Sequence, residues 1–138
     1  MKGENNLMHV GILILRVALG VSMMFHGIPK IFGGPETWAY VGSTMSNFGI
    51  NSGYEFWGLL AALAETVGGL FFALGLLFRP VSVLLFGTMV VALITHLSMG
   101  DNFLVYGHAL DLMIVFFATI FTGAGKYSLD SRYIPRIA

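Results

Sequence analysis

The chain contains no cysteine among its 138 residues. This absence excludes disulfide bonds, thiolate metal sites and any dithiol relay carried by the chain itself. Charged residues are also scarce, because they form 10% of the sequence, whereas a soluble domain carries about 25%. The net charge is zero, so electrostatics give no reason to expect nucleic acid or an acidic substrate as a partner.

Hydrophobic residues, by contrast, make up 57% of the sequence, which is more than a soluble domain of this size can bury. Four apolar stretches are each long enough to cross a hydrocarbon core, which takes about 20 helical residues. Lipid cannot satisfy backbone hydrogen bonds, so each stretch is expected to be a helix. The sequence predicts an all-α membrane protein, in which a single domain (residues 1–138) is a four-transmembrane-helix bundle. The predicted spans are about 7–27, 56–78, 81–99 and 103–122.

The first apolar stretch follows Lys2 and could also be a cleaved signal peptide. Arg16 interrupts it, however, and no small-x-small cleavage site follows, so a retained helix is favoured. The long connection after it contains Gly34-Pro35-Glu36, a pattern typical of a helix start. We expect a short amphipathic helix there, ending before Gly49, with an irregular loop as the alternative. Its apolar face would carry Trp38, Val41, Met45 and Phe48.

The other two connections are short, at Arg79-Pro80 and at Gly100-Asp101-Asn102, so consecutive helices should be antiparallel neighbours. Basic residues in short connections favour the cytoplasmic side of a membrane. One side would carry only Lys30. We therefore expect a multi-pass protein of the plasma (cytoplasmic) membrane with both termini in the cytoplasm. The cytoplasmic side would carry Lys2, Arg79, Lys126, Arg132 and Arg136.

Arg16 and Glu65 are ionisable groups inside predicted spans, where each needs a partner or a cavity. Small residues surround Glu65 on its helix, which indicates that it faces the bundle. We expect an Arg16–Glu65 pair that fixes helix register, and alternatively polarises a substrate or carries protons. The small residues are Gly58, Ala61, Ala62, Gly68 and Gly69.

A second group of polar residues gathers at the opposite, outer end of the predicted bundle. His108 and Asp111 are three residues apart and share a helix face, so the carboxylate can fix the imidazole tautomer for proton transfer. Alternatively, these residues only hydrogen-bond interfacial water. No local spacing supports a metal site, so none is predicted. The group consists of His26, Lys30, His96, His108 and Asp111.

Several segments resemble the DoxX family. They are Arg16-Val-Ala-Leu-Gly20, His26-Gly-Ile-Pro-Lys-Ile-Phe-Gly33, Ala64-Glu-Thr-Val-Gly-Gly-Leu-Phe-Phe-Ala-Leu-Gly75 with Arg79 after it, and Gly123-Ala-Gly-Lys-Tyr-Ser-Leu-Asp130. The resemblance implies a small four-helix bacterial or archaeal membrane protein. It also implies a link to membrane redox complexes that handle thiols, because the related DoxD family is similar to a subunit of a thiosulfate:quinone oxidoreductase. The resemblance carries over to Arg16, His26, Lys30 and Glu65, less closely to His96, and assigns no role to His108 or Asp111.

Together these observations favour a redox-associated membrane protein that binds a quinone. It would hold no metal and would work as an oxidoreductase subunit with a partner protein. His96, His108 and Asp111 would be its catalytic residues, and His26, Lys30, Arg16 and Glu65 would bind the quinone. A non-catalytic scaffold or chaperone subunit is the main alternative, and a small proton-linked transporter is another. The expected partners are the lipid bilayer, a redox protein and a second copy of the chain.

Overall fold

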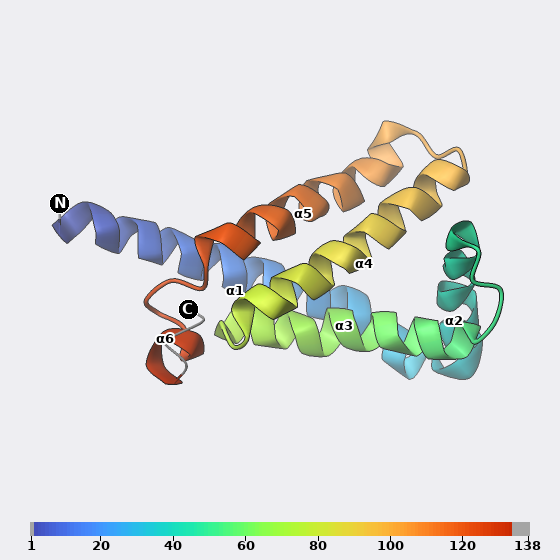
Figure 1. The fold of residues 1–138 in the computed structure, drawn as a ribbon, viewed down its shortest axis with the longest axis horizontal. Helices are drawn as coiled ribbons and strands as arrows, with labels where there is room; N and C mark the ends of the chain where they lie inside the picture. Colours follow the sequence, from blue (N-terminus) through green and yellow to red (C-terminus); the bar gives the residue numbers. More distant parts are fainter. Residues whose placement is uncertain (1, 134–138) are drawn as a thin grey trace.

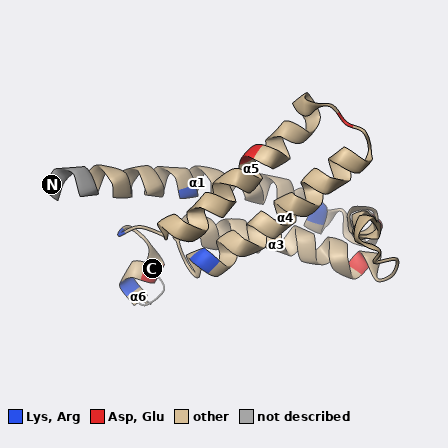
Figure 2. Cartoon of the chain, turned by 45° about the horizontal axis from the view of Figure 1, so that its top comes forward, with Lys and Arg blue, Asp and Glu red and all other residues tan. Residues whose placement is uncertain are grey.

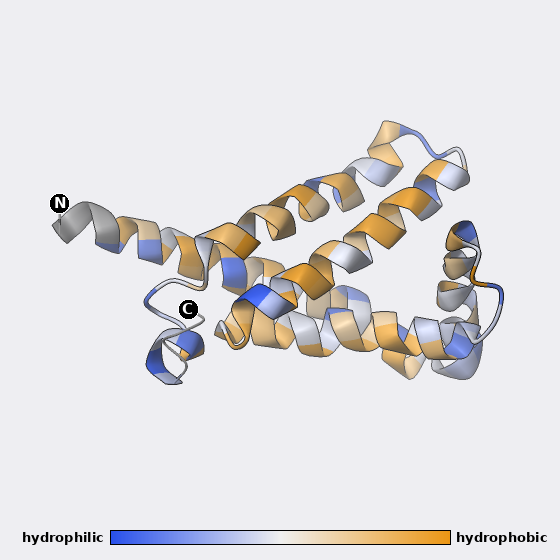
Figure 3. Cartoon of the chain, viewed as in Figure 1, coloured by the Kyte–Doolittle hydropathy of each residue, from blue (hydrophilic) through white to orange (hydrophobic). Residues whose placement is uncertain are grey.

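The computed structural model describes residues 2–133 and confirms the predicted all-α architecture. Four long helices, α1, α3, α4 and α5, are each long and apolar enough to cross a membrane (Figure 1). Hydrophobic residues cover them along most of their length, as Figure 3 shows, which fits helices surrounded by lipid. Arg136, which entered the predicted orientation, lies outside the described residues. The bounds are α1 Lys2–Phe32, α3 Tyr54–Leu74, α4 Phe78–Ser98 and α5 Phe103–Thr122.

The helices form two pairs, because α1 packs mainly on α3, and α4 packs mainly on α5. In Figure 1 the two pairs meet where α3 turns into α4 and diverge toward the turn between α4 and α5. We call these two ends of the bundle the closed end and the open end. Phe72, Phe78 and Phe116 form the core near the closed end, where each is fully buried.

Glycines set the register between α1 and α3. A Cβ atom on Gly69 would lie 2.7 Å from the carbonyl oxygen of Gly20, so the two backbones touch here. A Cβ atom on Gly27 would likewise lie 2.9 Å from the Cβ of Glu65. Small residues permit this close approach, which is a common way for membrane helices to associate. Gly27 and Glu65 therefore lie at the same depth.

The turn between α3 and α4 lies before the predicted Arg79-Pro80 connection. Gly75 ends α3 with φ of 64°, a left-handed conformation that glycine adopts without strain. Pro80 instead lies in the first turn of α4. The N–H groups of a first turn have no acceptor within the helix, so a proline there costs no helical hydrogen bond. At the other end of the span, α1 continues through Pro29 to Phe32 instead of ending near Gly27.

The amphipathic helix expected in the first connection is present as α2 (Gly34–Gly42), followed by the 3-10 helix η1 (Ser43–Phe48). Gly49 ends this segment with φ of 77°. The backbone of α2 rests directly on α3, because a Cβ atom on Gly42 would collide with the carbonyl oxygen of Tyr54. The segment therefore crosses the open end of the bundle, beside the start of α3 (Figure 1).

Candidate functional site

A cavity of about 610 Å³ lies between the diverging helices α3 and α4, with α2 and η1 at its open end. Its volume falls in the range of about 300–1,000 Å³ that small-molecule sites occupy. Most of its wall is apolar, and we call the part that carries its three charged or imidazole side chains the polar end. These three residues are Lys30, Glu65 and His96.

The cavity reaches the outer surface of the bundle between α3 and α4. Leu60, Val83 and Leu84 belong to its wall and are 42%, 53% and 44% exposed, respectively. All three lie within helices that are candidate membrane spans, so their exposed surface faces lipid. A hydrophobic molecule dissolved in the bilayer could therefore reach the polar end without passing through water.

Lys30 and Glu65 form an ion pair at the polar end of the cavity. The Lys30 Nζ atom lies 2.7 Å from each of the two carboxylate oxygens of Glu65. The Glu65 side chain is only 5% exposed, whereas that of Lys30 is 31% exposed. Lys30 is one helical turn beyond Gly27, which explains why it reaches Glu65. The Trp38 indole N–H donates to the Lys30 carbonyl oxygen at 2.9 Å and so ties α2 to this site.

The expected Arg16–Glu65 pair is wrong. Arg16 lies eleven residues from Gly27 along α1, about 16 Å away in depth, because a helix rises 1.5 Å per residue. Its guanidinium group instead donates to the carbonyl oxygens of Ala124, at 2.8 Å, and of Tyr127. Arg16 is 2% exposed, so these carbonyl groups replace the carboxylate that we expected.

The C-terminal segment that receives Arg16 also secures the closed end. Asp130, in helix α6 (Leu129–Tyr133), is fully buried. Its two carboxylate oxygens accept hydrogen bonds from the backbone N–H groups of Leu77 and Phe78, each at 2.8 Å. A carboxylate at this position satisfies the free N–H groups at the start of α4 and complements the helix dipole. The segment ending in Asp130 thus has a structural role.

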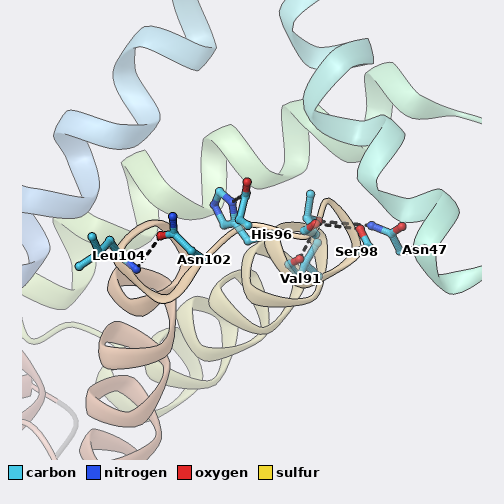
Figure 4. A network of polar contacts seen from close by, with 8 residues as sticks. Asn47, Val91, His96, Ser98, Asn102 and Leu104 are labelled. Atoms are coloured by element: carbon cyan, nitrogen blue, oxygen red, sulfur yellow. Dashed lines mark hydrogen bonds and ion pairs between the residues drawn. The ribbon is translucent and has the colours of Figure 1, made fainter.

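His96 is positioned by the turn at the open end. Its Nδ1 atom lies 2.8 Å from Oδ2 of Asp101, and both side chains are about one-third exposed. Nearby, the Asn47 amide of η1 donates to the Thr95 hydroxyl at 3.5 Å, which connects η1 to α4 (Figure 4). A carboxylate on Nδ1 orients the ring and leaves Nε2 available to a ligand.

His26 and His108 lie in a second, smaller cavity of about 220 Å³ between the two helix pairs. The centroids of their rings are 5.4 Å apart, so α1 and α5 bring them together as expected for one pocket. Lys30, Glu65 and His96 line this cavity too. The ion pair and His96 therefore stand between the two cavities and are accessible from both.

Asp111 follows His108 by three residues, but it belongs to the wall of neither cavity. It is exposed on α5, within the span, where Figure 2 shows an acidic residue between the helix ends. Within residues 2–133, its carboxylate has no hydrogen-bond or ion-pair partner. The same residues contain no cluster of three histidines or carboxylates that could hold a metal ion. The quinone-binding and catalytic roles assigned to these residues stay predictions.

Three residues of the site were missed by sequence reasoning. Asp101 was taken only as part of a turn, although it follows His96 by five residues and a tight turn can fold it back. Trp38 was assigned to an apolar face, and its N–H group gave no sign of a partner on α1. Asn47 carries a polar side chain on an amphipathic segment, a weak signal for a contact with α4.

Comparison with known proteins agrees with this architecture. The DoxX family model matches residues 11–98, which is more than half of the chain and contains α2, α3 and α4 and most of α1. The matched part includes Lys30, Glu65 and His96, the three polar residues between the cavities. No curated protein and no solved structure matches the chain. The extent of the family match and the four-helix membrane fold show that the chain belongs to the DoxX family.

Proposed function

We propose that this DoxX protein binds a quinone in the cleft between α3 and α4 as the quinone-binding subunit of a membrane oxidoreductase. The observation that carries the proposal is a lipid-accessible apolar cavity that ends at the Lys30–Glu65 pair and His96. A quinone likewise has a polar part and an apolar part, because it joins a ring with two carbonyl oxygens to a long hydrocarbon tail. The tail would lie along the apolar walls of α3 and α4.

The side chains at the polar end suit a carbonyl oxygen. The Lys30 ammonium group has three N–H donors, and the contacts to Glu65 leave at least one of them free. The Nε2 atom of His96 is not engaged by Asp101, which contacts Nδ1. Hydrogen bonds from these two residues would hold the ring, while Glu65 keeps the ammonium group in place.

A bound quinone supplies two-electron redox chemistry and takes up one proton per electron. The chain has no cysteine, so electrons would come from a redox partner protein. The contribution of this chain would be proton delivery from His96, whose contact with the partly exposed Asp101 leads toward the open end. His26 on α1 and His108 on α5 border the second cavity. They would exchange protons with the same polar end from that side.

Tryptophan fluorescence tests this proposal directly. Trp57 lines the cavity, and Trp38→Phe leaves it as the single tryptophan reporter. Because Trp38→Phe also removes the hydrogen bond to the Lys30 carbonyl oxygen, every protein compared carries it, the parent included. Decylubiquinone added to the purified protein in nanodiscs should quench this signal with saturation. His96→Leu should weaken the binding roughly five- to tenfold, as expected for the loss of one hydrogen bond.

His9→Leu is the matched control, because His9 lies near the start of α1 and lines neither cavity. It should bind decylubiquinone like the parent protein. Equal affinity of the His96→Leu and His9→Leu variants would contradict the site. Absence of saturable quenching, together with a polypeptide that co-purifies at fixed stoichiometry, would favour the scaffold function instead.

A further inference from the structure

Asp111 is an exposed carboxylate deep within a membrane span. It lies eight residues from Phe103, the first residue of α5, and thus about 12 Å along the helix from the open end. Its side chain is too short to reach water from that depth, unlike a lysine or an arginine. No residue among those described binds it, which leaves its carboxylate open to a partner on another polypeptide.

The surface around Asp111 differs from a lipid-facing helix surface. His108, Asp111, Ala118 and Thr122 are all exposed and fall on one side of α5 at helical spacing. Ala118 and Thr122 are small, which permits a close approach by another helix, and His108 and Asp111 offer polar contacts. The adjoining exposed residues are large and apolar, as lipid contact requires: Ile114, Phe117 and Phe121.

We propose that this side of α5 is the interface of a homodimer in which His108 of each copy donates a hydrogen bond to Asp111 of the other. The face carries a donor and an acceptor one helical turn apart, so it is complementary to a second copy of itself. A two-fold axis along the membrane normal places the two copies at equal depth. The pair must then bridge three residues of rise, about 4.5 Å, which side chains of adjacent helices can span.

Two-fold symmetry repeats this contact, so the dimer has two such hydrogen bonds, and every His108 and Asp111 takes part in one of them. A different membrane protein would need only a donor opposite Asp111 and would have no need of the His108 donor. A second copy of the chain uses both groups. Asp111 lines neither cavity, whereas His108 also borders the second one. Cross-linking reports the dimer without reference to quinone binding, and Asp111→Leu alters neither cavity wall, so the two proposals are tested separately.

The absence of cysteine makes a cross-linking experiment straightforward. Ala118→Cys places a single thiol on the proposed interface, two turns from Asp111, and oxidation of isolated membranes should then yield a disulfide-linked dimer. Val83→Cys is the control, because Val83 is 53% exposed on α4 and outside this face. It should give little dimer under the same conditions.

Charge exchange then tests the reciprocal pair. In the Ala118→Cys background, His108→Asp puts two carboxylates on each copy, and Asp111→His puts two imidazoles there. Each variant alone should lose about tenfold in dimer affinity, as expected for two interhelical hydrogen bonds in a membrane. Co-expression of the two variants with different tags should restore the dimer as the mixed species, in excess over either homodimer.

Failure of the mixed species to form would overturn the proposal, as would equal cross-linking through Val83→Cys. Should either exchanged variant fail to accumulate, Asp111→Leu replaces it, because leucine is stable in lipid wherever it faces. Retention of the parent dimer by Asp111→Leu would equally refute the interface. So would the capture of a different polypeptide by the thiol of the Ala118→Cys variant in place of the second copy.

Discussion

Removing the Lys30 ammonium group should destabilise the protein more than removing its partner. Lys30→Met leaves the Glu65 carboxylate without its cation while it remains 5% exposed. Breaking a buried ion pair from one side typically costs about 3–5 kcal/mol. Glu65→Leu leaves Lys30, which is 31% exposed and can turn toward water, so we expect a cost of only about 1 kcal/mol.

The double variant Lys30→Met, Glu65→Leu removes both charges and should recover most of the lost stability. Replacing a buried pair by apolar residues of similar volume is often neutral or stabilising. The two substitutions should therefore be coupled by roughly 3 kcal/mol, far above the deviation of about 0.5 kcal/mol expected for independent sites.

Thermal unfolding in detergent, followed by tryptophan fluorescence, measures this cycle. At about 3 °C per kcal/mol, Lys30→Met should lower the Tm by roughly 10 °C, and the double variant should lie within a few degrees of the parent. Decylubiquinone binding should be weakened in both, because the ammonium donor is missing from both. Additive effects on the Tm would refute the reasoning, since they would mean that the two side chains do not stabilise each other.

Asp130→Ala should lower the free energy of unfolding by about 3 kcal/mol, because it removes two hydrogen bonds to the start of α4. Thermal unfolding checks this, and Ser131→Ala, which loses only contacts within the C-terminal segment, is the comparison that should change less. Gly42→Ala should push α2 away from α3, since its Cβ atom would collide with the Tyr54 carbonyl oxygen. Faster proteolysis between α2 and α3 would detect this displacement, whereas Gly87→Ala, with open space around its Cβ position, should leave the pattern unchanged.

Much of the fold follows from local features of the sequence. The apolar stretches predicted four spanning helices because lipid forces each segment to satisfy its own backbone hydrogen bonds. Pro35 and Gly49 likewise predicted both ends of the segment formed by α2 and η1. The predicted turn at Arg79-Pro80 was misplaced, because Pro80 is compatible with the first turn of a helix as well as with a connection.

Only the tertiary structure decided which charges pair. The sequence predicted that Glu65 faces the bundle and pairs with Arg16, but it does not indicate how far α1 slides along α3. The contacts of Gly20 with Gly69 and of Gly27 with Glu65 fix that register and bring Lys30 to the carboxylate. Arg16 is then at the other end, where carbonyl groups of a segment more than 100 residues away receive it.

The sequence also did not predict that the two helix pairs diverge. Helices α3 and α4 carry few polar residues, and composition does not decide whether such helices pack closely or stand apart. The segment of α2 and η1 contacts both helices, because it rests on α3 through Gly42 and reaches α4 through Asn47. The sequence by itself therefore determined the membrane spans, while packing between distant segments created the cavity and its polar end.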